Sequence, residues 1–129
     1  RMIEKRGYTD RVAVVAGDMF TDPLPRDHDI HLFSNVLHDW DTNKVRFLLA
    51  ASAKALPTGG LLIVHDAHLN DDKTGPAPVA AYSALLMSVT EGRCYGTGEM
   101  RELLTEAGFT DIRHQDTACD RSIVTAVRK

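Results

Sequence analysis

The sequence is short of the features that mark several classes of protein. Its two cysteines, Cys94 and Cys119, lie far apart and form no CxxC pair, so neither a disulfide framework nor a zinc ribbon is indicated. No run of Lys and Arg favours nucleic acid or an anionic membrane surface. No apolar run approaches the ~20 residues that cross a bilayer, and no signal peptide is visible. We therefore expect a cytoplasmic protein that binds neither nucleic acid nor a membrane.

What is present is enough for one small domain. Of the 129 residues, 43% are apolar, which suffices to bury a core. Short apolar runs indicate buried strands, and longer stretches with apolar residues at helical spacing indicate helices. The expected strands cover residues 12–15, 29–34, 61–64, 110–113 and 122–127, and the expected helices cover 2–6, 41–56, 78–90 and 97–107. This alternation predicts an α/β fold with a mostly parallel sheet.

Polar side chains come soon after three of the expected strands. Asp18 follows the first run, His38 the second and Asp66 the third. In open α/β sheets, ligands bind outside the carboxyl ends of the strands. We therefore expect these three side chains to lie on a shared rim of one sheet and to open onto one cavity.

Four stretches of the chain carry a resemblance to a known family. They are Gly17–Phe20 (GDMF), Asn35–Trp40 (NVLHDW), Leu61–Asp66 (LLIVHD) and Glu106–Phe109 (EAGF). In that order they resemble the small-molecule S-adenosylmethionine-dependent O-methyltransferases related to caffeate and hydroxyindole methyltransferases. The resemblance implies a Rossmann-like class I methyltransferase sheet, S-adenosylmethionine as donor, and a small-molecule acceptor with an aromatic or similar hydroxyl. It also implies a homodimer for the full-length protein.

The resemblance further implies parts of the family's fold that this sequence lacks. Family members have an N-terminal dimerisation domain and then two strands, the first of which ends in a glycine-rich loop that holds the donor. The Gly59-Gly60 pair follows an expected helix and precedes an expected strand, which is the wrong context for that loop. We therefore expect residues 1–129 to be the C-terminal portion of a catalytic domain and to be inactive on their own.

His38 is the expected general base. A phenol with a pKa of about 10 is ionised only about one part in a thousand at pH 7, a deficit of roughly 4 kcal/mol. A positioned base typically contributes ~10²–10⁴-fold, and the pKa of histidine lies near the working pH. By the resemblance, Asp66 holds the imidazole in orientation and stabilises the imidazolium. The alternatives are that His38 caps the helix beginning at Asp41 or is merely exposed, and that Asp66 is a strand-end turn residue.

The family places a second acid shortly before the helix that opens here at Thr97, and that position falls on Cys94. A thiol does not supply the same charge. Three alternatives follow: Asp66 acts alone, Glu91 or Glu99 substitutes from nearby, or catalysis uses a weaker base.

The resemblance also assigns residues to the donor. Asp18 and Met19 match the family's adenine-binding pair, because a carboxylate can accept the amino hydrogens and a thioether can pack on the ring. Phe20 lies beside them, and packing of Met19 and Phe20 in the core is the alternative. Ser34 falls where many members place a basic residue near the adenosyl group.

The apolar helix expected at 78–90 puts Tyr82, Leu85 and Val89 on one face. By the resemblance this face lines the acceptor pocket, and its apolar character suits an aromatic substrate. Core packing is the alternative. Phenol, flavonoid, polyketide and indole hydroxyls all fit such a pocket.

Two other functions are open from the sequence. One is a metal-dependent hydrolase or oxygenase, for which Zn²⁺ or Fe²⁺ would suit the candidate ligands His38, His65, Asp66 and His68. Because His65 and Asp66 are adjacent on an expected strand, they should point to opposite faces, so we expect no metal site. The other is a non-catalytic methyltransferase-like binding domain, favoured by Cys94 and by the lack of the glycine-rich loop.

Overall fold

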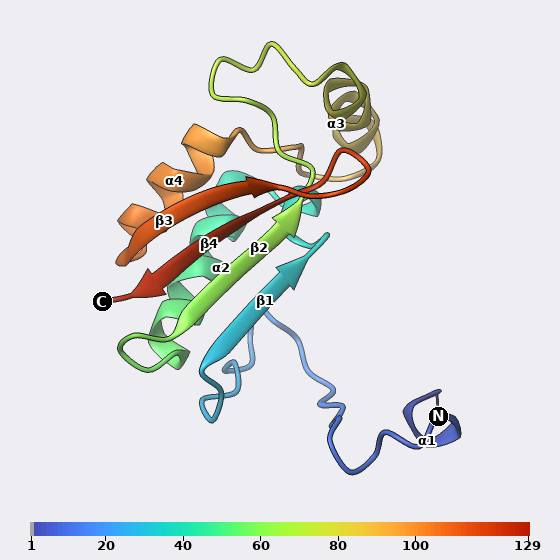
Figure 1. Ribbon diagram of the computed structural model, residues 1–129, viewed down its shortest axis with the longest axis vertical. Helices are drawn as coiled ribbons and strands as arrows, with labels where there is room; N and C mark the ends of the chain where they lie inside the picture. Colours follow the sequence, from blue (N-terminus) through green and yellow to red (C-terminus); the bar gives the residue numbers. More distant parts are fainter. Residues whose placement is uncertain (1) are drawn as a thin grey trace.

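A computed structural model describes residues 2–129 of the chain. Helices and strands alternate along most of it (Figure 1). In chain order the elements are α1 (Met2–Lys5), β1 (Ile30–Ser34), the 3-10 helix η1 (Leu37–Asp39), α2 (Thr42–Ala55), β2 (Leu61–Asp66), α3 (Ala77–Val89), α4 (Thr97–Glu106), β3 (Phe109–Asp116) and β4 (Ser122–Arg128).

The strands form one sheet in the order β1-β2-β4-β3. β1 and β2 are parallel, whereas β4 is antiparallel to both β2 and β3. The predicted α/β class is therefore confirmed, but the sheet of the described residues is mixed rather than mostly parallel. The reason is the short turn at 117–121, because two strands joined by so short a connection pair antiparallel.

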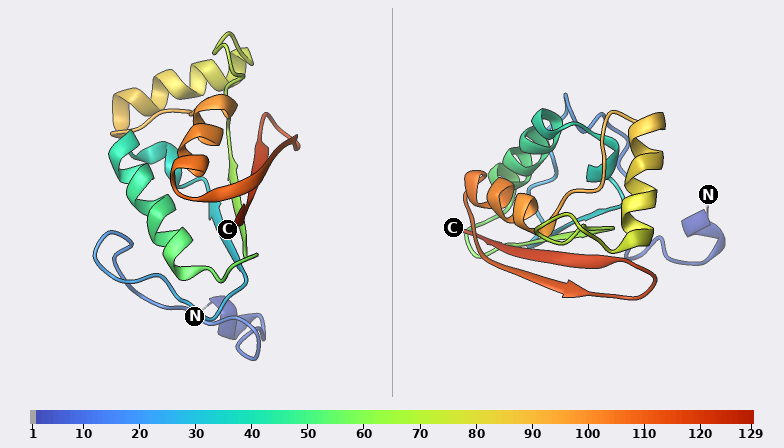
Figure 2. Two further views of the ribbon diagram at one scale, coloured as in Figure 1. Left: turned by 90° about the vertical axis from the view of Figure 1, so that its left-hand side faces the viewer. Right: turned by 90° about the horizontal axis from the view of Figure 1, so that it is seen from above.

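Two helices, α2 and α4, cover one face of the sheet, and α3 lies beyond the carboxyl end of β2 (Figure 2). Residues of β2 alternate between buried and half-buried, so that Leu62 and Val64 point into the core beneath the helices. The expected helix after Asp41 forms as predicted, and the Asp41 carboxylate caps it by accepting from the backbone N–H of Lys44 at 2.9 Å.

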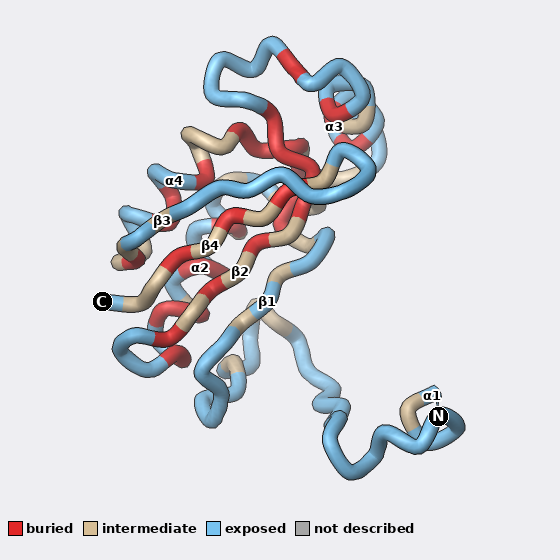
Figure 3. Tube along the Cα trace, in the orientation of Figure 1, coloured by how far each residue is buried: buried red, intermediate tan, exposed pale blue. Residues whose placement is uncertain are grey.

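The opposite face of the sheet is open in the described part of the chain. Ile30 and Leu32 of β1 are exposed there, and most of the chain before β1 is exposed as well (Figure 3). The strand predicted at 12–15 is wrong: Val14 and Val15 are 79% and 78% exposed and belong to no strand. No strand of residues 2–129 lies alongside to complete the hydrogen bonds that such a ladder requires.

No helix in the described residues combines the length and the apolar character needed to cross a membrane.

Candidate active site

His38 is placed by η1, the single helical turn that follows β1. The turn is anchored by Leu37, which is buried in the core, and by the hydroxyl of Tyr95, which donates to the carbonyl oxygen of Trp40 at 2.7 Å. His38 itself is 5% exposed. The imidazole is therefore held in a fixed position rather than displayed on the surface.

The central contact of the site joins His38 to Asp66 at the end of β2. His38 Nδ1 lies 2.5 Å from Asp66 Oδ1, and the carboxylate also accepts from the backbone N–H of Ala67 at 2.8 Å. An ionised carboxylate only accepts, so the ring hydrogen is on Nδ1 and the lone pair is on Nε2. The hydrogen bond to Asp66 raises the pKa of His38 above its usual value, although burial acts in the opposite direction.

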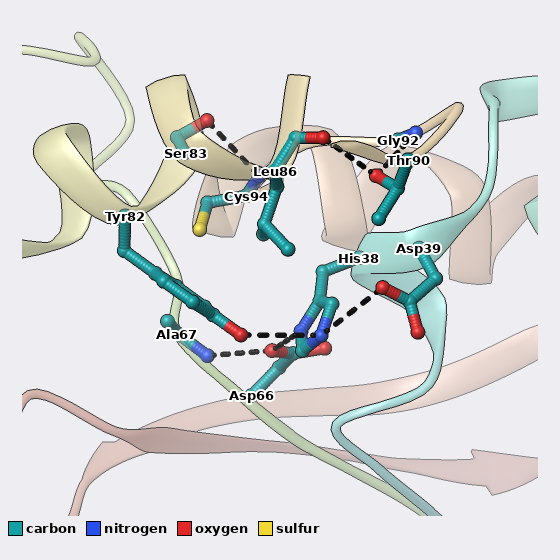
Figure 4. Close-up of polar contacts among 10 residues, drawn as sticks. All are labelled: His38, Asp39, Asp66, Ala67, Tyr82, Ser83, Leu86, Thr90, Gly92 and Cys94. Carbon is teal, nitrogen blue, oxygen red and sulfur yellow. Dashed lines mark hydrogen bonds and ion pairs between the residues drawn. The ribbon is translucent and has the colours of Figure 1, made fainter. Parts of the chain in front are cut away.

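Two groups lie near Nε2, the nitrogen that is free to act as a base. The hydroxyl of Tyr82 on α3 is 3.4 Å from it, and the Asp39 Oδ1 is 3.6 Å away (Figure 4). The charge of Asp39 also raises the pKa of His38. Sequence reasoning had not singled out Asp39, and its only signal was that it directly follows the histidine.

The predicted acceptor residues divide into two groups. Tyr82 is half-buried and contacts His38, with the two rings edge to face at 5.6 Å between centroids. Leu85 and Val89, farther along α3, are exposed, whereas Leu86 on the same helix is buried. Leu85 and Val89 are therefore not core residues of the described chain, which leaves them open to a ligand.

Cys94 occupies the place where a second acid was expected. It is fully buried, and burial raises the pKa of its thiol to about 11, so the thiol is neutral near pH 7. Its backbone N–H donates to the Ser83 hydroxyl at 3.1 Å. Cys94 therefore supplies no negative charge to the site.

The two suggested substitutes for that acid have other partners. Glu91 bonds to the ammonium of Lys44 at 2.5 Å. The Glu99 carboxylate accepts hydrogen bonds from both terminal nitrogens of Arg93, at 2.8 and 2.9 Å, and this pairing lowers the pKa of its carboxyl to about 2. Among the described residues, the carboxylates within ion-pair distance of His38 are those of Asp39 and Asp66.

Gly92 is a further residue of the site that sequence reasoning did not identify. It lies against the backbone of residues 38–40, where a Cβ atom would overlap the carbonyl oxygen of His38 and sit 2.5 Å from the Trp40 nitrogen. Only glycine permits so close an approach. A glycine in a loop has many possible reasons, so the sequence alone gave no means of finding it.

Asp18 lies apart from the His38–Asp66 pair. It is exposed, its Oδ1 accepts from the backbone N–H of Phe20 at 2.8 Å, and it lines a hollow of about 550 Å³ formed by residues 15–19 and 22–26. That hollow contains neither His38 nor Asp66, so the expected single cavity is not observed. The reason is that residues 12–15 do not join the sheet.

Met19 and Phe20 are half-buried and pack against the core, which was the alternative to donor binding for these two residues. The ring of Phe20 contacts Trp40 edge to face at 4.8 Å. The exposed Asp18 and the half-buried Met19 nevertheless line one hollow.

Ser34 ends β1, and its hydroxyl lies 2.9 Å from Nδ1 of His65. His65 is half-buried, whereas its neighbours Asp66 and His68 are buried. His65 therefore points to the opposite face of the sheet from Asp66, as expected for adjacent residues of a strand. No group of three or more His, Cys, Asp or Glu side chains within residues 2–129 is arranged to hold a metal ion.

Comparisons with known proteins place the chain in a family, and they do not favour the metal-enzyme alternative. A model of the O-methyltransferase domain family matches residues 2–110. The 3-hydroxy-5-methyl-1-naphthoate 3-O-methyltransferase of Streptomyces sahachiroi is 40% identical over 111 residues, which cover 86% of this chain and 32% of the relative. The chain thus spans about a third of that relative's length.

Two solved structures share the fold. One is the O-methyltransferase family 2 protein from Planctomyces limnophilus in complex with apigenin, with 39% identity and a TM-score of 0.93 over 99% of this chain and 38% of that one. The other is human N-acetylserotonin methyltransferase in complex with S-adenosylmethionine, with 28% identity and a TM-score of 0.84 over 94% of this chain and 36% of that one.

Proposed function

The chain belongs to the O-methyltransferase domain family, and on that premise we propose that the protein methylates a hydroxyl of a small molecule, with His38 as the general base. The observation that carries this proposal is the 2.5 Å bond between His38 Nδ1 and Asp66. It directs the lone pair of Nε2 toward the side of the site where the Tyr82 hydroxyl already lies.

In the proposed reaction, Nε2 takes the proton of the acceptor hydroxyl. The positive charge that forms on His38 is stabilised by Asp66, to which it is bonded, and by Asp39 at 3.6 Å. S-adenosylmethionine supplies a methyl carbon on a positively charged sulfur, so that the C–S bond breaks as the C–O bond forms. The protein's own contribution is to make the oxygen nucleophilic and to align it, and an aligned base of this kind is worth ~10²–10⁴-fold.

On the donor side, we assign the adenine to Asp18 and Met19. The Asp18 carboxylate can accept the amino hydrogens of the base, and Met19 can pack against its ring. Phe20 supports this stretch by packing on Trp40. Ser34 stands at the carboxyl end of β1, where we assign it to the adenosyl group.

On the acceptor side, we assign the apolar face of α3, with Tyr82 nearest the base and Leu85 and Val89 exposed beyond it. These side chains suit a flat aromatic ring. The relative from Streptomyces sahachiroi acts on a hydroxynaphthoate, and the Planctomyces structure holds apigenin. An aromatic hydroxyl is therefore the acceptor class that we propose.

We also propose that residues 1–129 are the C-terminal portion of a catalytic domain, and that the full-length protein is a cytoplasmic homodimer. Because the residues assigned here reach only the adenine end of the donor, we expect the 129 residues alone to be inactive. Calorimetry with S-adenosylhomocysteine tests this, since micromolar binding by the 129 residues would contradict it.

The test of the general base is His38→Gln in the full-length protein. We expect kcat to fall by at least about a hundredfold, while the affinity for S-adenosylhomocysteine stays within about twofold, because the change touches none of the residues assigned to the donor. His28→Gln, an exposed histidine outside the site, serves as the matched control. A His38→Gln protein that keeps more than about a tenth of the rate would remove His38 from this role.

A further inference from the structure

A second hollow lies close to the His38–Asp66 pair. It has a volume of about 210 Å³ and is bordered by the segment after β2, the start of α3 and the β3–β4 turn, which reaches toward α3 (Figure 1). Its buried lining is formed by His68, Val79 and Ser122. We call this space the turn hollow.

His68 lines the turn hollow, and one of its ring nitrogens has no hydrogen-bond partner in the described residues. The residue is 6% exposed, its Nδ1 lies 2.8 Å from the Ser122 hydroxyl, and its Nε2 is buried without a hydrogen-bond partner in the described residues. When the Ser122 hydroxyl donates to Nδ1, the ring hydrogen sits on Nε2 as a donor that has nothing to bond. Buried polar atoms are normally paired, so this orphan donor points to a missing acceptor.

Arg121 supplies a positive charge to the same hollow. Its guanidinium lies over the ring of Tyr82, 5.0 Å from the centroid, and forms no ion pair with any carboxylate of residues 2–129. A guanidinium offers several N–H donors in one plane, in a geometry that matches a carboxylate.

Two residues with exposed carboxylates also line the turn hollow. The side chain of Asp116 is 90% exposed and lies 3.5 Å from His114, and Asp120 is exposed. Their charges face water and are screened there. The buried lining therefore offers hydrogen-bond donors, while the acidic groups are outside it.

Tyr82 connects the turn hollow to the base. Its ring is the surface on which Arg121 stacks, and its hydroxyl is the group 3.4 Å from His38 Nε2. Val79, which lines the hollow, is one turn earlier on the same helix. The base and Arg121 thus contact the same tyrosine.

We propose that the turn hollow, through Arg121 and His68, is a subsite for a carboxylate carried by the aromatic acceptor. This assignment of the acceptor rests on the methyl transfer proposed above, whereas carboxylate binding in the hollow does not. Arg121 is then a specificity-determining residue, which selects acidic aromatic acceptors over neutral ones of the same shape.

The test uses the full-length protein and measures binding rather than turnover. Benzoate is titrated by calorimetry, and the ring resonances of His68 are followed by NMR. We expect benzoate to shift the His68 resonances and to bind at least about tenfold more tightly than benzamide, which has the same shape without the charge. Failure of benzoate to move the His68 resonances would overturn the subsite.

A variant and a matched control assign the binding to Arg121. Arg121→Gln should weaken benzoate binding by at least about tenfold, whereas Arg113→Gln, an exposed arginine on β3 paired with Asp111, should leave it unchanged. If Arg121→Gln lowers the melting temperature, Arg121→Lys keeps the charge without the planar donors and should bind benzoate more tightly than Arg121→Gln but more weakly than the unchanged protein. Equal affinity of the two Gln variants for benzoate would show that Arg121 does not bind the carboxylate.

Acetate and inorganic phosphate distinguish an acceptor subsite from a site for free anions. We expect both to bind at least about tenfold more weakly than benzoate, because they lack a ring that can pack on Val79 in the hollow. Equal binding of acetate would assign the hollow to free anions and overturn the acceptor subsite. Benzoate binding and the turnover of His38→Gln are measured separately. Failure of the carboxylate subsite can therefore be distinguished from failure of the proposed methyl transfer.

Discussion

At the scale of single residues, the chemistry of the site depends on how Asp66 sets the charge of His38. The hydrogen bond between them raises the pKa of His38, so the neutral imidazole that can accept a proton forms only above the ordinary value of about 6.5. The rate should therefore rise with pH through this raised pKa.

Asp66→Asn tests that dependence. An amide cannot stabilise the imidazolium as a carboxylate does, so the rising limb of kcat/KM should move to lower pH. The plateau should fall by at least about tenfold, because the orientation of the ring is lost as well. The pH profile of the full-length protein measures both effects. A lower plateau without movement of the rising limb would mean that Asp66 orients the imidazole but does not set the pKa of His38.

At the scale of elements, the position of His38 depends on contacts between η1 and the loop after α3. These segments are more than fifty residues apart in sequence, yet Gly92 lies against the backbone of residues 38–40. The Tyr95 hydroxyl from the same loop holds the Trp40 carbonyl oxygen. The loop thus supports the segment that carries the base.

Gly92→Ala tests this support. The added methyl group cannot fit without moving residues 38–40, so we expect kcat to fall by at least about tenfold while the fold is kept. Gly75→Ala is the control, because its Cβ would meet its nearest neighbour at 3.6 Å, an ordinary contact. The two variants should have the same circular dichroism spectrum, and only Gly92→Ala should turn over more slowly. Equal rates would show that η1 tolerates the displacement.

At the scale of the whole molecule, stability should depend on the buried histidine His68. Burial lowers the pKa of His68 from 6.5 to about 4. The unfolded chain binds this proton more readily than the folded one between these two values, so stability is complete above about pH 6.5 and is lost as pH falls toward 4. The full difference is roughly 3 kcal/mol.

His68→Gln tests the linkage, because glutamine does not titrate. Between pH 7 and pH 5 the protein should lose roughly 2 kcal/mol more of its free energy of unfolding than the variant does. Urea denaturation at the two pH values measures the difference, with His28→Gln as the exposed control. An identical loss in His68→Gln and the unchanged protein would contradict the burial of a neutral imidazole.

The sequence by itself determined the elements whose signals are local. Asp41 begins α2 as a cap, and Gly108 with its positive φ ends α4. It also placed His38 and Asp66 just after neighbouring parallel strands, so that the two side chains meet, since the carboxyl ends of such strands share one edge. Cap residues, apolar spacing and strand ends lie within a few positions of each other, which is why they can be read from the chain alone.

Only the tertiary structure decided which groups gather around that pair. The residues at 12–15 have the composition of a strand, but a strand needs a partner, and none lies beside them in the described residues. The approach of Gly92 to η1, of Tyr82 to Nε2 and of Arg121 to Tyr82 comes from packing between elements far apart in sequence. Such contacts depend on how whole elements are oriented in space, and no short stretch of sequence carries that information.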